Sequence, residues 1–254
     1  MTTYKSYNTA PFQFINGLGI SNDATTPNTL LDIGAGSTLD STGTFQLTSS
    51  SNITINAATN GLNGLDTGTF AASTVYAVYL IADPVTLKPI GGMLSLSYTQ
   101  PLMPFGYSAF ALLGFATSDA SVHFLKGYWT DTDSATRIFF YDAPQATSVT
   151  AGTNTAYATG AIALTTLVPS INNLPVYINS SFIPGNAAGD TLTMQPFNAT
   201  GDAVTITGQV TTVHVTTQSL LLAQLGTGVP KINYKVTNAG DTAAINVGGY
   251  IFTL

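Results

Sequence analysis

Thr74-Val-Tyr-Ala-Val-Tyr-Leu-Ile-Ala82 is the stretch that decides the fold class of this 254-residue chain. Every residue after the opening threonine is apolar or aromatic, and most are β-branched or aromatic. Such side chains fit the pleated surface of a sheet, and a run without polar alternation is typical of a strand covered on both sides. The stretch therefore predicts a strand that is buried on both faces.

Turn-forming residues lie on both sides of this strand. Asn60-Gly61 and Asn63-Gly64 precede it, and these residue types adopt the positive φ angles that tight turns need. Pro84, Pro89 and Gly91-Gly92 follow it and predict a loop.

The same texture continues along the chain, with short β-branched and aromatic runs between Gly, Asn, Asp and Pro residues. This pattern is typical of sandwiches and barrels, and no long segment has the 3.6-residue period of a helix. The texture changes past Thr130, where a polar turn precedes the new strand-like run Ile138-Phe-Phe-Tyr141. We predict an all-β chain of two domains: residues 1–128 form a β-rich domain, and residues 129–254 form an antiparallel, jelly-roll-like β-sandwich.

The alternation changes phase within the second half. Apolar residues fall on even positions from Val204 to Val210 and on odd positions at Val213 and Val215. Because side chains alternate between the faces of a strand, a phase change requires an inserted residue or a bend. We predict a β-bulge or a corner between Gly208 and Thr212.

The end of the chain is apolar. Ile232, Tyr234 and Val236 are predicted to share one face of a strand, and so are the terminal residues Ile245, Val247 and Ile251. Chain ends are loose unless a strand or helix holds them, and this end is too apolar to be left in water. The pattern predicts that the last strand is paired in a sheet.

Charge is scarce. Charged residues are 7% of the chain, against roughly 25% in ordinary globular domains. Glutamate is absent, Arg137 is the one arginine, and the formal net charge is −6. Nucleic acid and anionic membranes are excluded as partners because both require clustered Lys and Arg. A surface with so little charge predicts that copies of the chain cover one another in a homo-oligomer.

Cysteine is absent, which excludes disulfides, thiolate metal sites and cysteine nucleophiles. The N-terminus, Met1-Thr-Thr-Tyr-Lys-Ser-Tyr-Asn8, lacks the apolar stretch of a signal peptide. The longest apolar run, Ala109 to Ala116, is far shorter than the about 20 residues of a membrane-spanning helix. We expect a protein that is made in a cytoplasm and assembled without secretion.

Residues suited to catalysis or metal binding are few and scattered. His123 and His214 are the only histidines, without the spacing of a zinc site, although a threefold axis would bring three copies of each together. Asp131 and Asp133 lack the glycine and the closing acidic residue of a calcium loop. Gly34-Ala-Gly36 lacks the third glycine and the helix of a dinucleotide-binding loop, so it predicts a turn. We predict no catalytic residue, no cofactor and no metal site, and hence no enzyme.

Aromatic residues permit one binding interpretation, a platform on which sugars stack. Core packing and subunit contacts account for most of them better. The candidates are Tyr76, Tyr79, Phe105, Tyr107, Phe110, Tyr128 and Trp129.

Several motifs resemble a module common in tailed-phage fibres and other virion proteins. In the first half they are Ile15-Asn-Gly-Leu-Gly-Ile-Ser-Asn22, Leu31-Asp-Ile-Gly-Ala-Gly-Ser37 and Gly61-Leu-Asn-Gly-Leu-Asp-Thr-Gly68, followed by the strand at Val75 and by Pro104-Phe-Gly-Tyr107. In the second half, Gly189-Asp-Thr-Leu-Thr-Met-Gln-Pro196 and Pro230-Lys-Ile-Asn-Tyr-Lys-Val236 are similar to sandwich regions of such proteins.

The resemblance implies a structural virion protein with an N-terminal attachment module. It implies a homo-oligomer, usually a trimer, forming a tail fibre or a spike-like appendage that contacts other virion proteins and host surface glycans. A capsid decoration or a head or collar fibre stays open as an alternative. A secreted carbohydrate-binding module is a second alternative, and the missing signal peptide counts against it.

Overall fold

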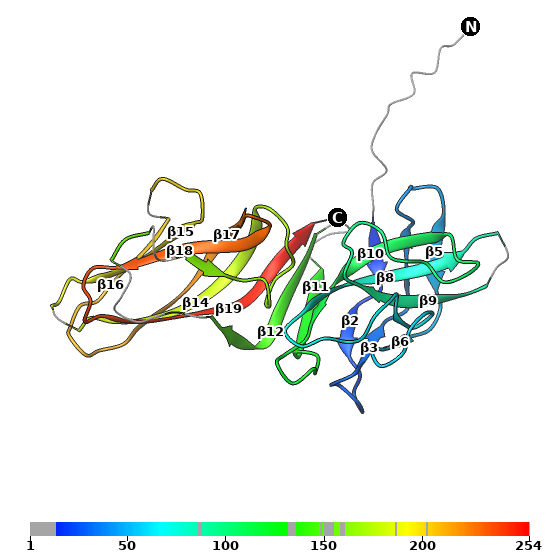
Figure 1. Ribbon diagram of the computed structural model, residues 1–254, viewed down its shortest axis with the longest axis horizontal. Coiled ribbons are helices and arrows are strands. Elements are labelled where there is room, and N and C mark those ends of the chain that lie inside the picture. The colour runs from blue at the N-terminus through cyan, green and yellow to red at the C-terminus, as the bar shows by residue number, and fades with distance from the viewer. Residues whose placement is uncertain are drawn as a thin grey trace, which may run out of the picture.

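The computed structural model describes residues 14–85, 88–131, 136–147, 149, 155–157, 161–185, 187–201 and 203–253. These residues form strands, turns and bends and no helix, so the predicted all-β class is confirmed. No described segment is a helix long and apolar enough to cross a bilayer. Figure 1 shows two lobes side by side along the long axis, with β11 and β12 between them.

The strands of the N-terminal lobe are short apart from β8, β9 and β10. They are β1 (Ile15–Gly17), β2 (Ile20–Asn22), β3 (Leu30–Ile33), β4 (Gly36–Leu39), β5 (Gln46–Ser49), β6 (Ile53–Asn56), β7 (Gly64–Leu65), β8 (Val75–Asp83), β9 (Lys88–Ser95) and β10 (Ala109–Thr117).

The strands that follow join the lobes or build the C-terminal lobe. They are β11 (Gly127–Asp131), β12 (Thr136–Ala146), β13 (Ala161–Ala163), β14 (Leu174–Ile183), β15 (Thr191–Pro196), β16 (Val204–Thr207), β17 (Val215–Gly226), β18 (Val229–Val236) and β19 (Thr242–Thr253).

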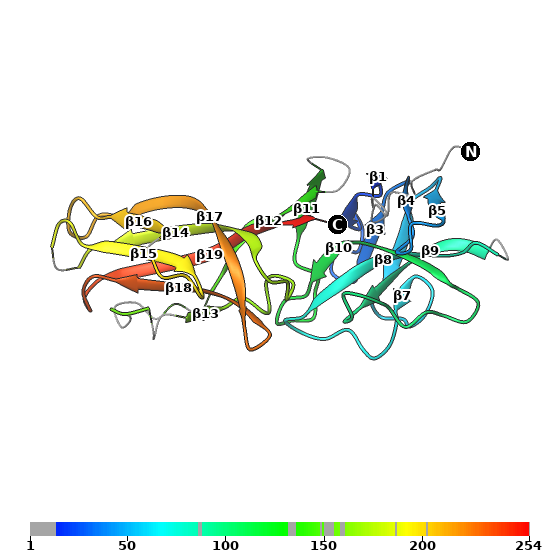
Figure 2. The ribbon, with the colours of Figure 1, turned by 90° about the horizontal axis from the view of Figure 1, so that it is seen from above.

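One sheet runs through both lobes, in the order β16-β15-β18-β17-β14-β19-β12-β11-β2-β3-β6, with β13 paired to β18. Smaller sheets, β1-β4-β5 and β10-β8-β9-β7, complete the N-terminal lobe. Strand β17 pairs with β14 over most of its length and with β18 only at Gln224–Gly226, so it joins the two layers of the C-terminal lobe. The pairing between the named strands is antiparallel except at β7–β9, and the predicted sandwich-like antiparallel sheets are confirmed. Figure 2 shows both lobes from above.

Strand β8 is buried along its whole length, as predicted. Successive residues point to opposite faces, and each face belongs to a different apolar core. Val75, Ala77, Tyr79 and Ile81 pack in a core shared with the C-terminal lobe, and Tyr76, Val78, Leu80 and Ala82 pack in a core of the N-terminal lobe.

The turns before β8 have the predicted geometry, with φ of +94° at Gly61 and +58° at Asn63. The predicted loop after β8 is wrong from Lys88 onward, because β9 begins there and includes Pro89. Gly91 and Gly92 also lie in β9, opposite Ile81 and Leu80. A Cβ atom at Gly92 would lie 2.6 Å from the Ile55 side chain, so these glycines permit close packing rather than a turn.

The lobes meet through aromatic side chains. Phe115 of β10 packs against Phe252 of β19 with ring centres 5.0 Å apart, and Trp129 of β11 lies 5.8 Å from Tyr250. Burial raises the pKa of the Tyr250 hydroxyl well above its usual value, so the group stays neutral. The predicted boundary between residues 128 and 129 falls inside β11, and the division into two domains stays a prediction.

A corner separates β16 from β17, as the phase change predicted. Strand β16 ends at Thr207, and the Thr212 amide, with a φ of +65°, donates to the Pro184 carbonyl oxygen. The apolar face that we predicted for the next residues is wrong at Val213, which is 51% exposed. This residue precedes β17 and lies in the corner.

Ile232, Tyr234 and Val236 are all buried, which confirms their shared face. The terminal strand is paired as predicted, with β14 on one side and β12 on the other.

The prediction that Ile251 shares the face of Ile245 and Val247 is wrong. Tyr177 pairs with Gly249 and Ile178 with Val247, so Gly248 is an extra residue in β19. This bulge reverses the alternation, and Tyr250 and Phe252 take the buried positions instead.

Candidate functional site

One face of the C-terminal lobe points away from the core. Along β14, Val176, Ile178 and Ser180 are buried, whereas Tyr177 and Asn179 alternate with them on the opposite side and are only partly buried. This side continues across β17, β14, β19, β12 and β11, which are neighbours in the sheet. We call it the outer face.

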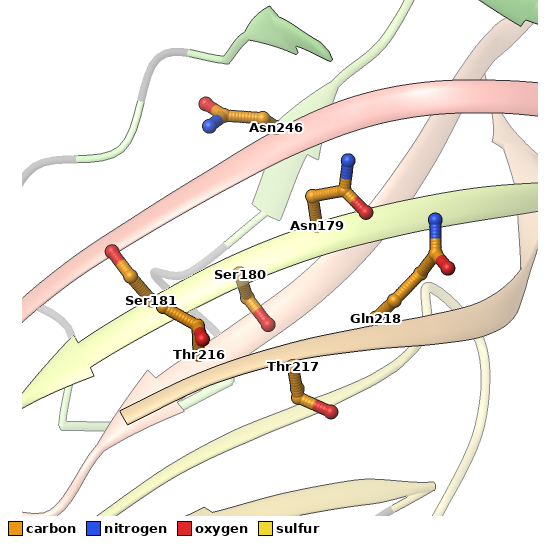
Figure 3. A pocket seen from close by; sticks show the side chains of 7 residues that line it. All are labelled: Asn179, Ser180, Ser181, Thr216, Thr217, Gln218 and Asn246. Atoms are coloured by element: carbon orange, nitrogen blue, oxygen red, sulfur yellow. The ribbon is translucent and has the colours of Figure 1, made fainter. Parts of the chain in front are cut away.

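Three amide side chains form a row across the outer face. Asn179 of β14 lies opposite Gln218 of β17 on one side and opposite Asn246 of β19 on the other. Directly opposed residues of antiparallel strands present their side chains on the same face. Figure 3 shows the three amides standing on the same side of their ribbons. We call Gln218, Asn179 and Asn246 the amide row.

The amide row lies in a shallow groove of about 510 Å³. Ser181 and Thr216, which oppose each other one step further along the strands, extend it, while Ser180 and Thr217 turn to the other side of the sheet. The groove is lined by Asn179, Ser180, Ser181, Thr216, Thr217, Gln218 and Asn246. None of these residues carries a charge.

None of the three side chains of the amide row forms a hydrogen bond with another residue of the described ranges. Each amide offers one accepting oxygen and two N–H donors. The row therefore presents both donors and acceptors to a ligand in the groove, and no internal bond has to be broken first.

Aromatic rings form a second row beside the amides. Tyr128 of β11 lies opposite Phe140 of β12, with ring centres 5.6 Å apart. Phe140 lies 5.1 Å from Tyr177 of β14, although β19 runs between their strands. Leu220 of β17, opposite Tyr177 and 50% exposed, continues the row. We call Tyr128, Phe140 and Tyr177 the aromatic row.

Glycines in β19 make this arrangement possible. Gly249 pairs with both Phe140 and Tyr177 and has no side chain, so the two rings can meet above it. A Cβ atom there would lie 2.0 Å from the Phe139 carbonyl oxygen. A Cβ atom at Gly248 would lie 3.1 Å from the Asn179 amide nitrogen, so this glycine leaves room for the amide row.

The histidines are far apart in the fold. His123 lies in the turn before β11, where its Nδ1 is 3.9 Å from an Asp119 carboxylate oxygen, and His214 is exposed just before β17. Gly34 lies between β3 and β4, where a turn was predicted. Asp133 lies outside the described residues, and Asp131 ends β11. In the described ranges, no three His or Asp side chains are close enough together to hold a metal ion.

The predicted sugar-stacking residues do not form one platform. Tyr76 and Tyr79 point to opposite faces of β8 and are buried in different cores. Phe105, in the turn that begins at Pro104, is 99% exposed. Tyr107, Phe110 and Trp129 pack against the cores. Tyr128, which is 54% exposed, is the member of the set that lies on the outer face.

The amides, Phe140 and Tyr177 were not among the candidate residues. Their signal in the sequence is alternation with period two, as in Tyr177-Ile-Asn-Ser-Ser181 and in Thr216-Thr-Gln-Ser-Leu220. That alternation shows which residues of one strand share a face. It does not show which strands are neighbours.

No protein-family model and no curated protein matches the chain. Among solved structures, the chain is similar to a carbohydrate-binding module from Cellvibrio mixtus lichenase 5A in complex with cellotriose. The identity is 14% and the TM-score is 0.22, and the match covers 51% of this chain and 87% of that chain. It is also similar to the structure of infectious bursal disease virus, Gx strain, with 12% identity, 97% and 68% covered, and a TM-score of 0.20. Likenesses this weak carry no argument about function.

Proposed function

We propose that this chain is a structural component of a tailed-phage virion, in which it forms an oligomeric tail fibre or spike-like appendage and contacts host surface glycans through the outer face. It acts by binding and not by catalysis. The motifs described above support the virion assignment.

The observation that carries the glycan contact is the amide row beside the aromatic row. A hydroxyl group of a sugar both donates and accepts hydrogen bonds, as an amide does. The less polar face of a sugar ring can lie on Tyr128, Phe140 and Tyr177 while its hydroxyls reach the amides. Ligand sites commonly combine apolar surface with a few placed polar groups in this way.

We predict that the double variant Asn179→Ala/Gln218→Ala binds host cells at least about fivefold more weakly, because two lost hydrogen bonds together contribute about 1–3 kcal/mol. Adsorption of labelled protein to host cells measures the change. The matched control is Asn52→Ala/Gln100→Ala, which removes two exposed amides of the N-terminal lobe. Equal loss in both double variants, or no loss in the first, contradicts the proposed site.

The same experiment tests the absence of catalysis. Purified host polysaccharide incubated with the protein should release no new reducing ends. Release of sugar fragments that stops in a His123→Ala variant would make the chain an enzyme and overturn this part of the proposal.

We further propose that the oligomer is a trimer. Leu96 and Leu102 of the N-terminal lobe are 62% and 64% exposed, and exposed apolar side chains on a chain with 7% charge favour cover by other copies. Sedimentation at micromolar concentration should give three times the 26.3 kDa mass of one chain. A species of 26.3 kDa would contradict an oligomer in solution.

We propose that the chain is located on the tail of the particle. Antibody labelling of whole particles should mark the tail or its baseplate. Labels distributed over the capsid or at the collar would instead identify the chain as a capsid decoration or as a head or collar fibre.

A further inference from the structure

We infer that the ligand of the outer face is an uncharged, linear oligosaccharide of about four sugar rings that lies across the strands from β17 to β11. The inference rests on the proposed function, and it adds the charge, the length and the direction of the ligand.

The direction follows from the two rows. Gln218, Asn179 and Asn246 are successive partners across β17, β14 and β19, so the amide row runs perpendicular to the strands. The aromatic row runs the same way, since Tyr177 is two residues before Asn179 on β14. Two residues along a strand are about 6.6 Å. A chain of sugars lying along the rows can stack on rings and reach amides repeatedly, whereas a chain lying along one strand meets each row once.

The length follows from the number of strands. The rows together extend from Gln218 and Leu220 on β17 to Tyr128 on β11, with β14, β19 and β12 between. Neighbouring strands are about 4.8 Å apart, so the four gaps span about 19 Å. Sugar rings in an extended chain advance by a similar distance per ring, which gives about four rings.

The charge follows from what the groove lacks. The groove is lined only by uncharged side chains, and the one arginine, Arg137, is 1% exposed and points into the junction of the lobes. The exposed Lys126, two residues before Tyr128, is not among the residues that line the groove. A carboxylate or sulfate group bound here would lose part of its hydration without a cation to replace it. The formal net charge of −6 opposes an anionic ligand as well.

The test uses the full-length protein and a glycan array. The array carries linear glucan, mannan and galactan oligosaccharides of two to six rings, together with counterparts in which uronic acids replace the neutral sugars. We expect binding to at least one neutral series, at least about tenfold stronger for four rings than for two, and little further gain at six. Uronic acid counterparts should bind at least tenfold more weakly.

Variants locate the ends of the ligand. Tyr128→Ala, at the far end of the aromatic row, should weaken binding of four rings about tenfold and leave binding of two rings nearly unchanged. Tyr177→Ala should weaken both. Phe45→Ala is the matched control, because Phe45 is a 42% exposed aromatic residue of the N-terminal lobe. Melting temperatures of all variants identify any loss of folding, and Tyr128, which is 54% exposed, keeps the test informative if Tyr177→Ala unfolds.

The outcomes separate the inference from the proposed function. Equal binding of two and four rings, stronger binding of uronic acid glycans, or no effect of Tyr128→Ala overturns the inference and leaves glycan binding in place. Binding to no glycan on the array, together with host adsorption that is unchanged in Asn179→Ala/Gln218→Ala, overturns both.

Discussion

A chain that ends at Gly249 should not fold into soluble oligomers. The deletion removes Tyr250 and Phe252, both buried, from the contacts that join the lobes. Tyr250 lies 5.3 Å from Phe139 and 5.8 Å from Trp129, and Phe252 lies 5.0 Å from Phe115, all between ring centres. Truncation of a single buried aromatic side chain costs about 3–5 kcal/mol, and whole domains are stable by only about 5–15 kcal/mol. Losing both rings and the end of β19 therefore removes most of the available stability.

Soluble yield, sedimentation and circular dichroism measure this outcome. Two controls are informative. A chain without Met1–Thr3 should be tolerated better than the C-terminal deletion. Thr253→Ala, at an exposed position of β19, should change stability by less than about 0.5 kcal/mol. Normal oligomers with unchanged melting after the C-terminal deletion would mean that the pairing of β19 with β12 and β14 is dispensable.

The features that could be predicted are those set within one strand. The apolar run of β8 shows its burial on both faces because no partner strand is needed to interpret it. The pairing of the terminal strand was also predictable, since the segment Tyr250-Ile-Phe-Thr-Leu254 is too apolar to be left in water. The position of Ile251 was not predictable, because Gly248 becomes a bulge only through the register of β19 on β14.

The glycines of β9 also show that a position cannot be interpreted from its local sequence alone. Gly91 and Gly92 signal a loop in the sequence, yet they lie in β9 because Leu62 and Ile55 pack where their side chains would be. Those neighbours come from segments well before β9 in the sequence. Whether a glycine marks a turn or a closely packed strand therefore depends on distant residues, which the local sequence does not show.

The outer face was missed for a related reason. Its residues come from β11, β12, β14, β17 and β19, which span the second half of the chain. Asn179, Gln218 and Asn246 are unremarkable in isolation, and only the register of three strands places them in a row. The scarcity of charge was visible in the sequence, but only the structure shows that uncharged residues of three strands line one groove.

Substitution of Arg137 is the second change for which we expect a large effect on stability. Its Nη1 donates to the Leu113 carbonyl oxygen at 2.8 Å, and its Nη2 donates to the Leu18 carbonyl oxygen at 3.2 Å. The guanidinium also lies 5.5 Å from the centre of the Trp129 ring. One side chain of β12 thus connects β10 and the segment between β1 and β2 to the junction of the lobes.

We predict that Arg137→Met lowers the free energy of unfolding by about 3–5 kcal/mol. Two effects oppose each other. Burying a guanidinium costs hydration, and replacing a whole buried ion network with apolar residues is often neutral. Here the acceptors are the backbone carbonyls of Leu18 and Leu113, which are fully buried. The substitution removes their donor, and no change of side chain can remove the carbonyls themselves. Each orphaned group costs about 1–3 kcal/mol, which outweighs the recovered hydration.

Denaturant unfolding at fixed protein concentration measures the change as a shift in midpoint at constant slope. Arg137→Lys should fall between wild type and Arg137→Met, because one ammonium group keeps the charge but cannot reproduce the planar fork that reaches both carbonyls. Lys126→Met is the matched control, since Lys126 is exposed. Its loss removes the same charge from the surface and leaves no buried carbonyl without a donor. Its effect should stay within about 0.5 kcal/mol. If Arg137→Met is as stable as Lys126→Met, hydration of the guanidinium balances both hydrogen bonds, and the shared sheet and the aromatic contacts hold the lobes together without Arg137.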